Sequence, residues 1–327
     1  MSGLAAAVLL LFAVGPTTAA AQPAEKMARV GYISPGAASD PVRQGRLEAF
    51  RQGLRDLGYV EGRNIAIESR WAEGKYDRYP ALAADLVRLK VHVIVAVGGR
   101  ASQVAQQATS TIPIIMSVVI DPVGAGLVSN LARPRGNITG VSMMAPDLIG
   151  KQFEVLKQIV PEVTRVALLW NPANPSSVPQ LRQAEVAARA VGLRVQRLEA
   201  RSPQDIDSAF AAMTSERAGA LVVLLDAILV NQRSQITELA AKRRLPAVYA
   251  VREYAEAGGL VSYGANALEL ERYAARFVDK VLRGARPSDL PVEQPSTFEL
   301  VINLKTAKIL GLTIPPSLLL RADQVIK

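Results

Sequence analysis

The residues best suited to bind an anion follow a nearly continuous apolar stretch of the chain. Residues 91–99 read VHVIVAVGG, and Arg100, Ala101 and Ser102 come next. Gly98 and Gly99 let the backbone approach a ligand closely, and a helix starting after them would present free N–H groups. Arg100 and Ser102 could add side-chain donors. The loop at 98–102 therefore predicts a carboxylate-binding site; the alternative is that the glycines only turn the chain and Arg100 is solvated.

Further polar residues stand where other predicted strands end. Asp121 and Asp226 could accept a hydrogen bond from a ligand, or cap a turn or helix. Asn171 and Asn174, in WNPANP at 170–175, could hold polar groups of a ligand or stabilise the proline turn. The remaining candidates for the wall of a binding cleft are Ser34, Tyr249 and Tyr263.

Most catalytic chemistries are excluded by composition. The chain has no Cys and one His, which rules out disulfides, thiolate metal sites, a Cys nucleophile and a multi-His metal site. His92 has no accompanying motif, so we expect a structural histidine. Gly124-Ala125-Gly126 is a weak match to a dinucleotide loop, and no GxxxxGK[ST], HExxH or GxSxG occurs. We therefore predict no catalytic residue, no metal and no cofactor.

The basic character of the chain does not indicate nucleic-acid binding. The formal net charge is +9. Lys and Arg are nevertheless interleaved with Asp and Glu, as in DRYPALAADLVRLK at 77–90. A nucleic-acid site would concentrate them on one patch. The pattern favours a dispersed basic surface.

The first residues are typical of an export signal. Residues 1–21 carry no charged side chain, Leu4 to Val14 is apolar, and Ala19-Ala20-Ala21 suits signal peptidase. The apolar run is shorter than the roughly 20 residues that span a bilayer. With no Cys to carry a lipid, we expect a soluble periplasmic protein without a lipid anchor.

The elements that would position the candidate residues alternate between strands and helices. Strands are expected at 29–34, 65–69, 91–99, 112–120, 137–144, 165–170, 194–200, 220–226, 246–250 and 258–264. Helical patterns separate most of them, including one from Leu229 to Arg244. This alternation predicts an α/β fold of two doubly wound, Rossmann-like lobes with parallel sheets. Ligands bind such folds beyond the carboxyl ends of the strands, where the candidate residues lie.

Several long motifs carry a resemblance to a known family. They are VGYISPG at 30–36, AFRQGLRDLGYVEGRN at 49–64, RWAEGKYDRYPALAADLV at 70–87, DPVGAGLVSNLARPRGNITG at 121–140, WNPANP at 170–175, EAGGLVSYG at 256–264 and residues 291–326. From about residue 28 onward the chain resembles ABC-transporter substrate-binding proteins of the periplasmic type I fold. The branch is the one that includes tryptophan- and tyrosine-type binders.

The resemblance implies two lobes joined by three crossover strands, with a ligand trapped between them. It implies a signal peptide at 1–21, an N-terminal lobe at 27–140, a C-terminal lobe at 141–263, a return to the first lobe at 264–288 and to the second at 289–327. The expected function is to trap a small polar or carboxylate-bearing solute, an amino acid or a related compound, and to deliver it to an ABC permease. We expect a monomer. The family often has Gly-Thr-Pro-Ala after its third strand, whereas this chain has Gly99-Arg100-Ala101-Ser102, so the aromatic amino-acid preference is not carried over.

Two other functions stay open at this point. One is an exported two-lobed α/β enzyme, such as a transferase, because a fold alone does not determine function. The other is a sensory ligand-binding module of a membrane receptor. Turnover of a bound compound would distinguish the enzyme from a binding protein.

Overall fold

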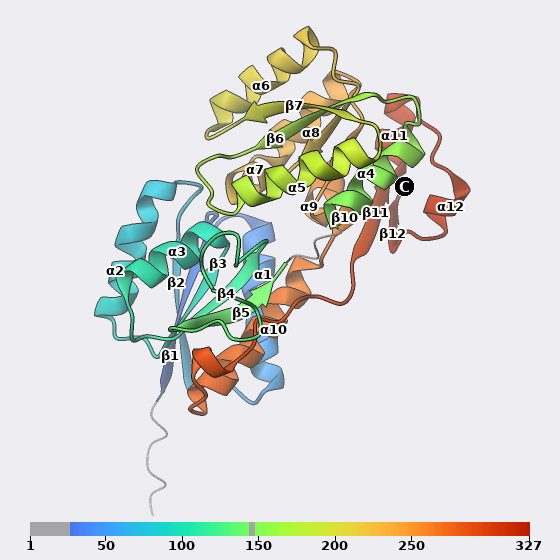
Figure 1. The fold of residues 1–327 in the computed structure, drawn as a ribbon. Helices are drawn as coiled ribbons and strands as arrows, with labels where there is room; N and C mark the ends of the chain where they lie inside the picture. Colours follow the sequence, from blue (N-terminus) through green and yellow to red (C-terminus); the bar gives the residue numbers. More distant parts are fainter. Residues whose placement is uncertain (1–26, 144–147) are drawn as a thin grey trace, which may run out of the picture.

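The chain forms two α/β lobes around two separate sheets (Figure 1). The computed structural model describes residues 27–143 and 148–327. The predicted signal segment, residues 1–21, lies outside the described residues. None of the helices in the two described ranges is both long and apolar enough to cross a bilayer.

The N-lobe, as we name it here, contains a five-stranded parallel sheet in the order β2-β1-β3-β4-β5. Its strands are β1 (Ala28–Ser34), β2 (Ile65–Trp71), β3 (Val93–Val97), β4 (Ile114–Val119) and β5 (Ile138–Ser142). Its helices are α1 (Pro41–Asp56), η1 (Tyr76–Arg78), α2 (Tyr79–Arg88), α3 (Gly99–Ala108) and α10 (Ala267–Leu282), and η2 (Pro287–Asp289) lies against β5.

Helix α1 shows how the sequence builds this lobe. Asp40 caps its first turn by accepting a hydrogen bond from the Val42 N–H, and Pro41 fits the first helical position. Leu47, Phe50 and Leu54 recur at helical spacing and are buried. Helix α1 packs along α10, which comes from much later in the chain and also covers strands β3, β4 and β5.

The C-lobe contains a seven-stranded sheet in the order β12-β11-β10-β9-β8-β6-β7. Its strands are β6 (Arg165–Trp170), β7 (Arg194–Glu199), β8 (Ala220–Val223), β9 (Ala247–Tyr249), β10 (Val261–Gly264), β11 (Glu299–Asn303) and β12 (Gln324–Ile326). Its helices are α4 (Leu148–Ile159), α5 (Ser177–Ala190), α6 (Pro203–Ser215), α7 (Ala227–Asn231), α8 (Arg233–Lys242), α9 (Arg252–Glu256), α11 (Leu304–Leu310) and α12 (Pro316–Leu319).

Two local features differ from the sequence expectation. The helix expected from Leu229 to Arg244 is divided into α7 and α8, because Asp226 caps an earlier start and α7 ends at Asn231. Strands β10 and β11 pair antiparallel rather than parallel. The reason is that the chain crosses to the N-lobe after β10 and re-enters this sheet from that side.

The chain passes between the lobes three times, after β5, after β10 and after η2. Strand β5 spans residues 140 and 141, where the sequence placed the end of the first lobe. Glu293, on the third passage, pairs with β5: its N–H donates to the Gly140 carbonyl at 3.0 Å and its carbonyl accepts from Ser142 at 2.9 Å. The third passage therefore runs beside the end of β5.

Candidate functional site

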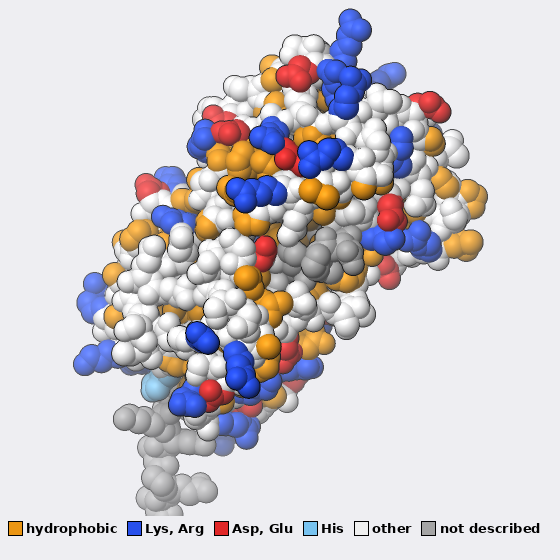
Figure 2. All heavy atoms as spheres, viewed as in Figure 1, with side chains coloured by type: hydrophobic (Ala, Val, Ile, Leu, Met, Phe, Trp, Pro, Cys, Tyr) orange, Lys and Arg blue, Asp and Glu red, His pale blue; other side chains and the backbone are white. Residues whose placement is uncertain are grey.

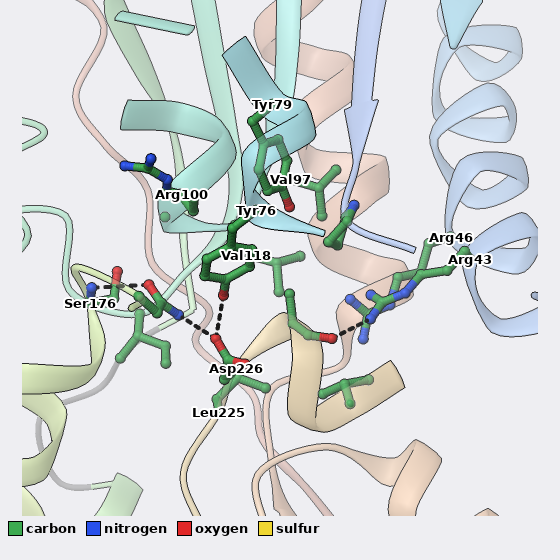
Figure 3. A pocket seen from close by; sticks show the side chains of 17 residues that line it. Arg43, Arg46, Tyr76, Tyr79, Val97, Arg100, Val118, Ser176, Leu225 and Asp226 are labelled. Atoms are coloured by element: carbon green, nitrogen blue, oxygen red, sulfur yellow. Dashed lines mark hydrogen bonds between the residues drawn. The ribbon is translucent and has the colours of Figure 1, made fainter. Parts of the chain in front are cut away.

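A cavity lies between the lobes, at the carboxyl ends of strands from both sheets (Figure 3). Its empty volume is about 490 Å³, part of it open to solvent. The N-lobe contributes Pro35, Arg43, Arg46, Tyr76, Tyr79, Val97, Gly98, Gly99, Arg100, Val118 and Ile120, and the C-lobe contributes Asn174, Ser176, Leu225, Asp226, Ala227 and Val230.

The start of helix α3 forms one end of this cavity. Gly98 has a φ of +91°, which favours glycine, and no side chain caps the helix. A Cβ atom at Gly99 would lie 2.4 Å from the Ser176 Oγ, so glycine is needed for the lobes to approach this closely. The Ser176 hydroxyl is buried and has no hydrogen-bond partner within the described chain. An uncapped helix start beside a free buried hydroxyl is suited to an anionic ligand group.

Asp226 organises the C-lobe side of the cavity. Its Oδ1 accepts from the Asn171 amide at 3.0 Å and from the N–H groups of Ile228 and Leu229 at 2.9 and 3.2 Å. Its Oδ2 accepts from the Asn174 amide at 3.0 Å and from the Tyr76 hydroxyl of the N-lobe at 2.5 Å. The carboxylate therefore caps α7, fixes the loop after β6 and touches the opposite lobe at once.

Three further polar contacts hold the lobes together beside the cavity. The Arg46 guanidinium on α1 donates to Glu253 on α9 at 2.6 Å, with both side chains buried. Arg43, one turn earlier, donates to the Asn231 side-chain oxygen at 2.6 Å. Arg233 on α8 pairs with Asp40 at 3.1 Å. The two lobes are therefore in direct contact with each other beside the cavity.

Burial and charge act in opposite directions on these groups. Burial raises the pKa of Glu253, but the charge and hydrogen bonds of Arg46 outweigh burial and leave that pKa below its ordinary value. Arg43 has no carboxylate at hydrogen-bonding distance. Burial, followed by repulsion from Arg46, lowers the pKa of Arg43 to about 10. Arg43 is thus a buried cation whose positive charge is only partly balanced by carboxylates.

Five of the predicted site residues line the cavity: Gly98, Gly99, Arg100, Asn174 and Asp226. The Arg100 guanidinium donates to Gln103 at 2.7 Å and, in Figure 3, points away from Tyr76 and Asp226. A ligand contact by these residues stays a prediction.

The other predicted residues lie outside the cavity lining. The Asn171 amide donates a hydrogen bond to Asp226 without itself lining the cavity. Ser34 ends β1, where its carbonyl accepts from the Ala72 N–H, and Ala101 is buried in the core. The remaining four make local contacts: Ser102 donates to the Gly98 carbonyl, Asp121 accepts from the Gly124 N–H, Tyr249 stacks on Tyr254, and Tyr263 packs against Phe298.

Sequence reasoning missed five polar side chains of the cavity: Arg43, Arg46, Tyr76, Tyr79 and Ser176. A signal for the arginines was present, because residues 43 and 46 share the helix face of Leu47, Phe50 and Leu54, where a charge is unusual. The tyrosines follow β2, and no candidate residue was predicted at the carboxyl end of that strand. His92, in contrast, has a structural role as expected: its Nδ1 accepts from the Arg29 N–H at 2.9 Å.

Replacing the buried Glu271 of α10 should remove a pH dependence of stability. Burial raises the pKa of Glu271 to about 7, against a smaller opposing influence of Arg46. The folded state keeps a proton that the unfolded state releases above about pH 4.5, so the free energy of unfolding falls as pH rises towards about 7. Over this range the loss is on the order of 2–3 kcal/mol.

We therefore expect Glu271→Gln to unfold at higher urea concentration than the unsubstituted protein at about pH 8 and at a similar concentration at about pH 5. Urea titrations at both pH values measure the difference. Equal changes with pH in both proteins would contradict the assignment, because other titrating groups are common to them.

The fold and the cavity together define a class of protein: two α/β lobes that enclose a small ligand between the ends of their sheets. This is the periplasmic type I binding fold. A leucine binding protein from Thermotoga maritima shares it, with a TM-score of 0.60 at 16% identity, over 79% of this chain and 83% of that one.

A more specific assignment follows from the family comparison. A model of the ABC transporter substrate binding protein family matches residues 36–326. The chain belongs to this family. A small-molecule ligand and an ABC permease as partner are implied by this membership, and members are extracellular or periplasmic proteins.

Two relatives are similar over most of their length. A "Tyrosine-binding protein" from Clostridioides difficile (strain R20291) is 27% identical over 265 residues, which are 81% of this chain and 76% of the relative. The ABC domain from Streptococcus pneumonia, solved in complex with L-Trp, has a TM-score of 0.86 at 30% identity and covers 92% of this chain and 100% of its own.

Proposed function

We propose that the protein traps a small carboxylate-bearing solute, an amino acid or a related acid, in the cavity between its lobes and delivers it to an ABC permease. The observation that carries this proposal is the uncapped start of α3 beside the unpartnered Ser176 hydroxyl. Helix N–H groups and a hydroxyl together form a site for a carboxylate. The apolar lining at Val97, Val118 and Leu225 suits the body of such a solute. The ligands named for the two relatives, tyrosine and L-Trp, are consistent with it.

The proposal includes the mode of action. The protein acts in the periplasm as a monomer, without turning its ligand over and without a cofactor. It does not act on nucleic acid, and the scatter of basic and acidic side chains over the face in Figure 2 supports this part of the proposal. Binding closes the lobes only to the extent that the ligand fits the closed state better than the open one.

Ser176→Ala should weaken the binding of a carboxylate ligand about tenfold, because one hydrogen bond to a charged group contributes about 1.5 kcal/mol. A thermal-shift screen of amino acids, other carboxylates, purines and sugars first identifies the ligand class, and calorimetry then measures the affinity. Ser177→Ala is the matched control, since Ser177 is also buried with an unpaired hydroxyl but does not line the cavity. Equal effects of the two substitutions would remove Ser176 from the site. Chemical conversion of any ligand would contradict the proposed function as a whole.

A further inference from the structure

The cavity presents hydrogen-bond donors at both ends. In Figure 3 Ser176 and Arg100 lie on one side and Arg43 and Arg46 on the other, with Tyr76, Val118 and Leu225 between them. The first end is the start of α3, and the second is the buried face of α1. A ligand that spans the cavity therefore meets donors at each end and an apolar or aromatic wall in the middle.

Arg43 is a cation whose direct partners are neutral. Its guanidinium donates to the Asn231 side-chain oxygen at 2.6 and 3.2 Å and to the Ala227 carbonyl at 3.4 Å. Asp40 comes no closer than 4.0 Å and is engaged by Arg233 at 3.1 Å. Arg46, the next cation on the same face, is paired with Glu253. The positive charge of Arg43 is thus available to a ligand anion.

Asp226 is not available to a ligand cation. It is the one acidic side chain among the described residues that line the cavity. Its two oxygens already accept five hydrogen bonds, including both amides of the 171–174 loop and the Tyr76 hydroxyl. An ammonium group would have to displace one of these donors, at the cost of leaving it unpaired.

The charges of the cavity lining also favour an anionic ligand. The lining carries three cations, Arg43, Arg46 and Arg100, and one anion, Asp226. Arg100 is directed towards Gln103, and Glu253 neutralises Arg46 from outside the lining. The balance around the cavity is positive, so a ligand with net negative charge is favoured over a zwitterion. The incomplete compensation of Arg43, whose pKa falls to about 10 through burial and repulsion by Arg46, agrees with this balance.

We propose that the ligand is an organic anion without an α-ammonium group, with a carboxylate at one end of the cavity, a second acceptor group at the other and an apolar or aromatic body. Arg43 selects for the negative charge. This inference rests on the proposed function and names its substrate class: an aromatic or aliphatic acid rather than the corresponding amino acid.

Two pairs of compounds that differ only in the ammonium group test the inference. We expect 3-(4-hydroxyphenyl)propionate and glutarate, each with an acceptor group at both ends, to bind about tenfold or more tightly than L-tyrosine and L-glutamate, respectively, by calorimetry. Tighter binding of the amino acids would overturn the inference and leave the proposed function standing. Failure of all four compounds, together with no carboxylate in the thermal-shift screen, would overturn both.

The Arg43→Gln variant separates charge selection from a structural role. Arg43 also joins the lobes, so its loss can weaken every ligand by the same factor. Selection by charge predicts instead that the affinity ratio of acid to amino acid falls to near parity. Asn231→Ala is the control, because it removes the neutral partner and keeps the cation, and its ratio should stay at the unsubstituted value. An unchanged ratio in Arg43→Gln would overturn the role of Arg43.

Discussion

Asp226→Ala is expected to abolish measurable ligand binding and to lower the free energy of unfolding by about 3–5 kcal/mol. The carboxylate is buried and accepts hydrogen bonds from two amide side chains, two helix N–H groups and one hydroxyl. Its removal leaves these donors without a partner and uncaps α7. The loop that carries Asn174 and Ser176 then loses its fixed position beside the cavity. Urea denaturation and calorimetry with the identified ligand measure the two effects.

Tyr76→Phe is the matched control for this experiment. It removes only the hydrogen bond from the N-lobe and leaves the four donors from the C-lobe in place. We expect unchanged stability and a loss of affinity of about tenfold, because one interlobe hydrogen bond is lost on closure. If Asp226→Ala were as stable as the unsubstituted protein, the carboxylate would not be the organising group of this loop.

The main outline of the fold could be predicted from the sequence because its signals are local. Apolar runs such as residues 91–99 and helical spacings such as Leu47, Phe50 and Leu54 indicate strands and helices without knowledge of the partner. The antiparallel pairing of β11 could not be predicted in this way. It depends on where the chain re-enters the second sheet, which no local pattern records.

The candidate site was predictable where it follows the rule that ligands bind beyond the ends of parallel strands. Gly98, Gly99 and Asp226 each follow an apolar strand and line the cavity. This rule does not identify Arg43 and Arg46, because they lie within a helix and contact partners about 200 residues away in the chain. It also does not reveal that Asp226 already accepts five hydrogen bonds, since their donors come from three separate segments: the 171–174 loop, the start of α7 and Tyr76.

Glu253→Gln is expected to lower ligand affinity by more than about 100-fold while leaving the free energy of unfolding of each lobe nearly unchanged. In the closed form Arg46 and Glu253 are a buried ion pair, and removal of one partner from such a pair costs about 3–5 kcal/mol. In an open form both side chains would be solvated, so the cost falls on closure rather than on folding. Because a ligand must then bring about closure against this cost, its apparent affinity falls.

Calorimetry and small-angle scattering with saturating ligand test this expectation. Glu256→Gln is the matched control, because Glu256 lies on the same helix and pairs with Arg252 of that helix rather than with the N-lobe. The double variant Arg46→Met, Glu253→Met should recover much of the closure seen by scattering with saturating ligand, since it removes both buried charges. Its affinity is not the readout, because Arg46 also lines the cavity.

The pH dependence of closure has a defined sign. The pKa of Glu253 is lowered in the closed form, as the pull of Arg46 exceeds the effect of burial. The pair therefore stabilises closure at neutral pH, and this contribution is lost only as pH falls through the lowered pKa. If Glu253→Gln bound its ligand as tightly as the unsubstituted protein, or if the double variant closed less completely than the single one at saturating ligand, the ion pair would not control closure.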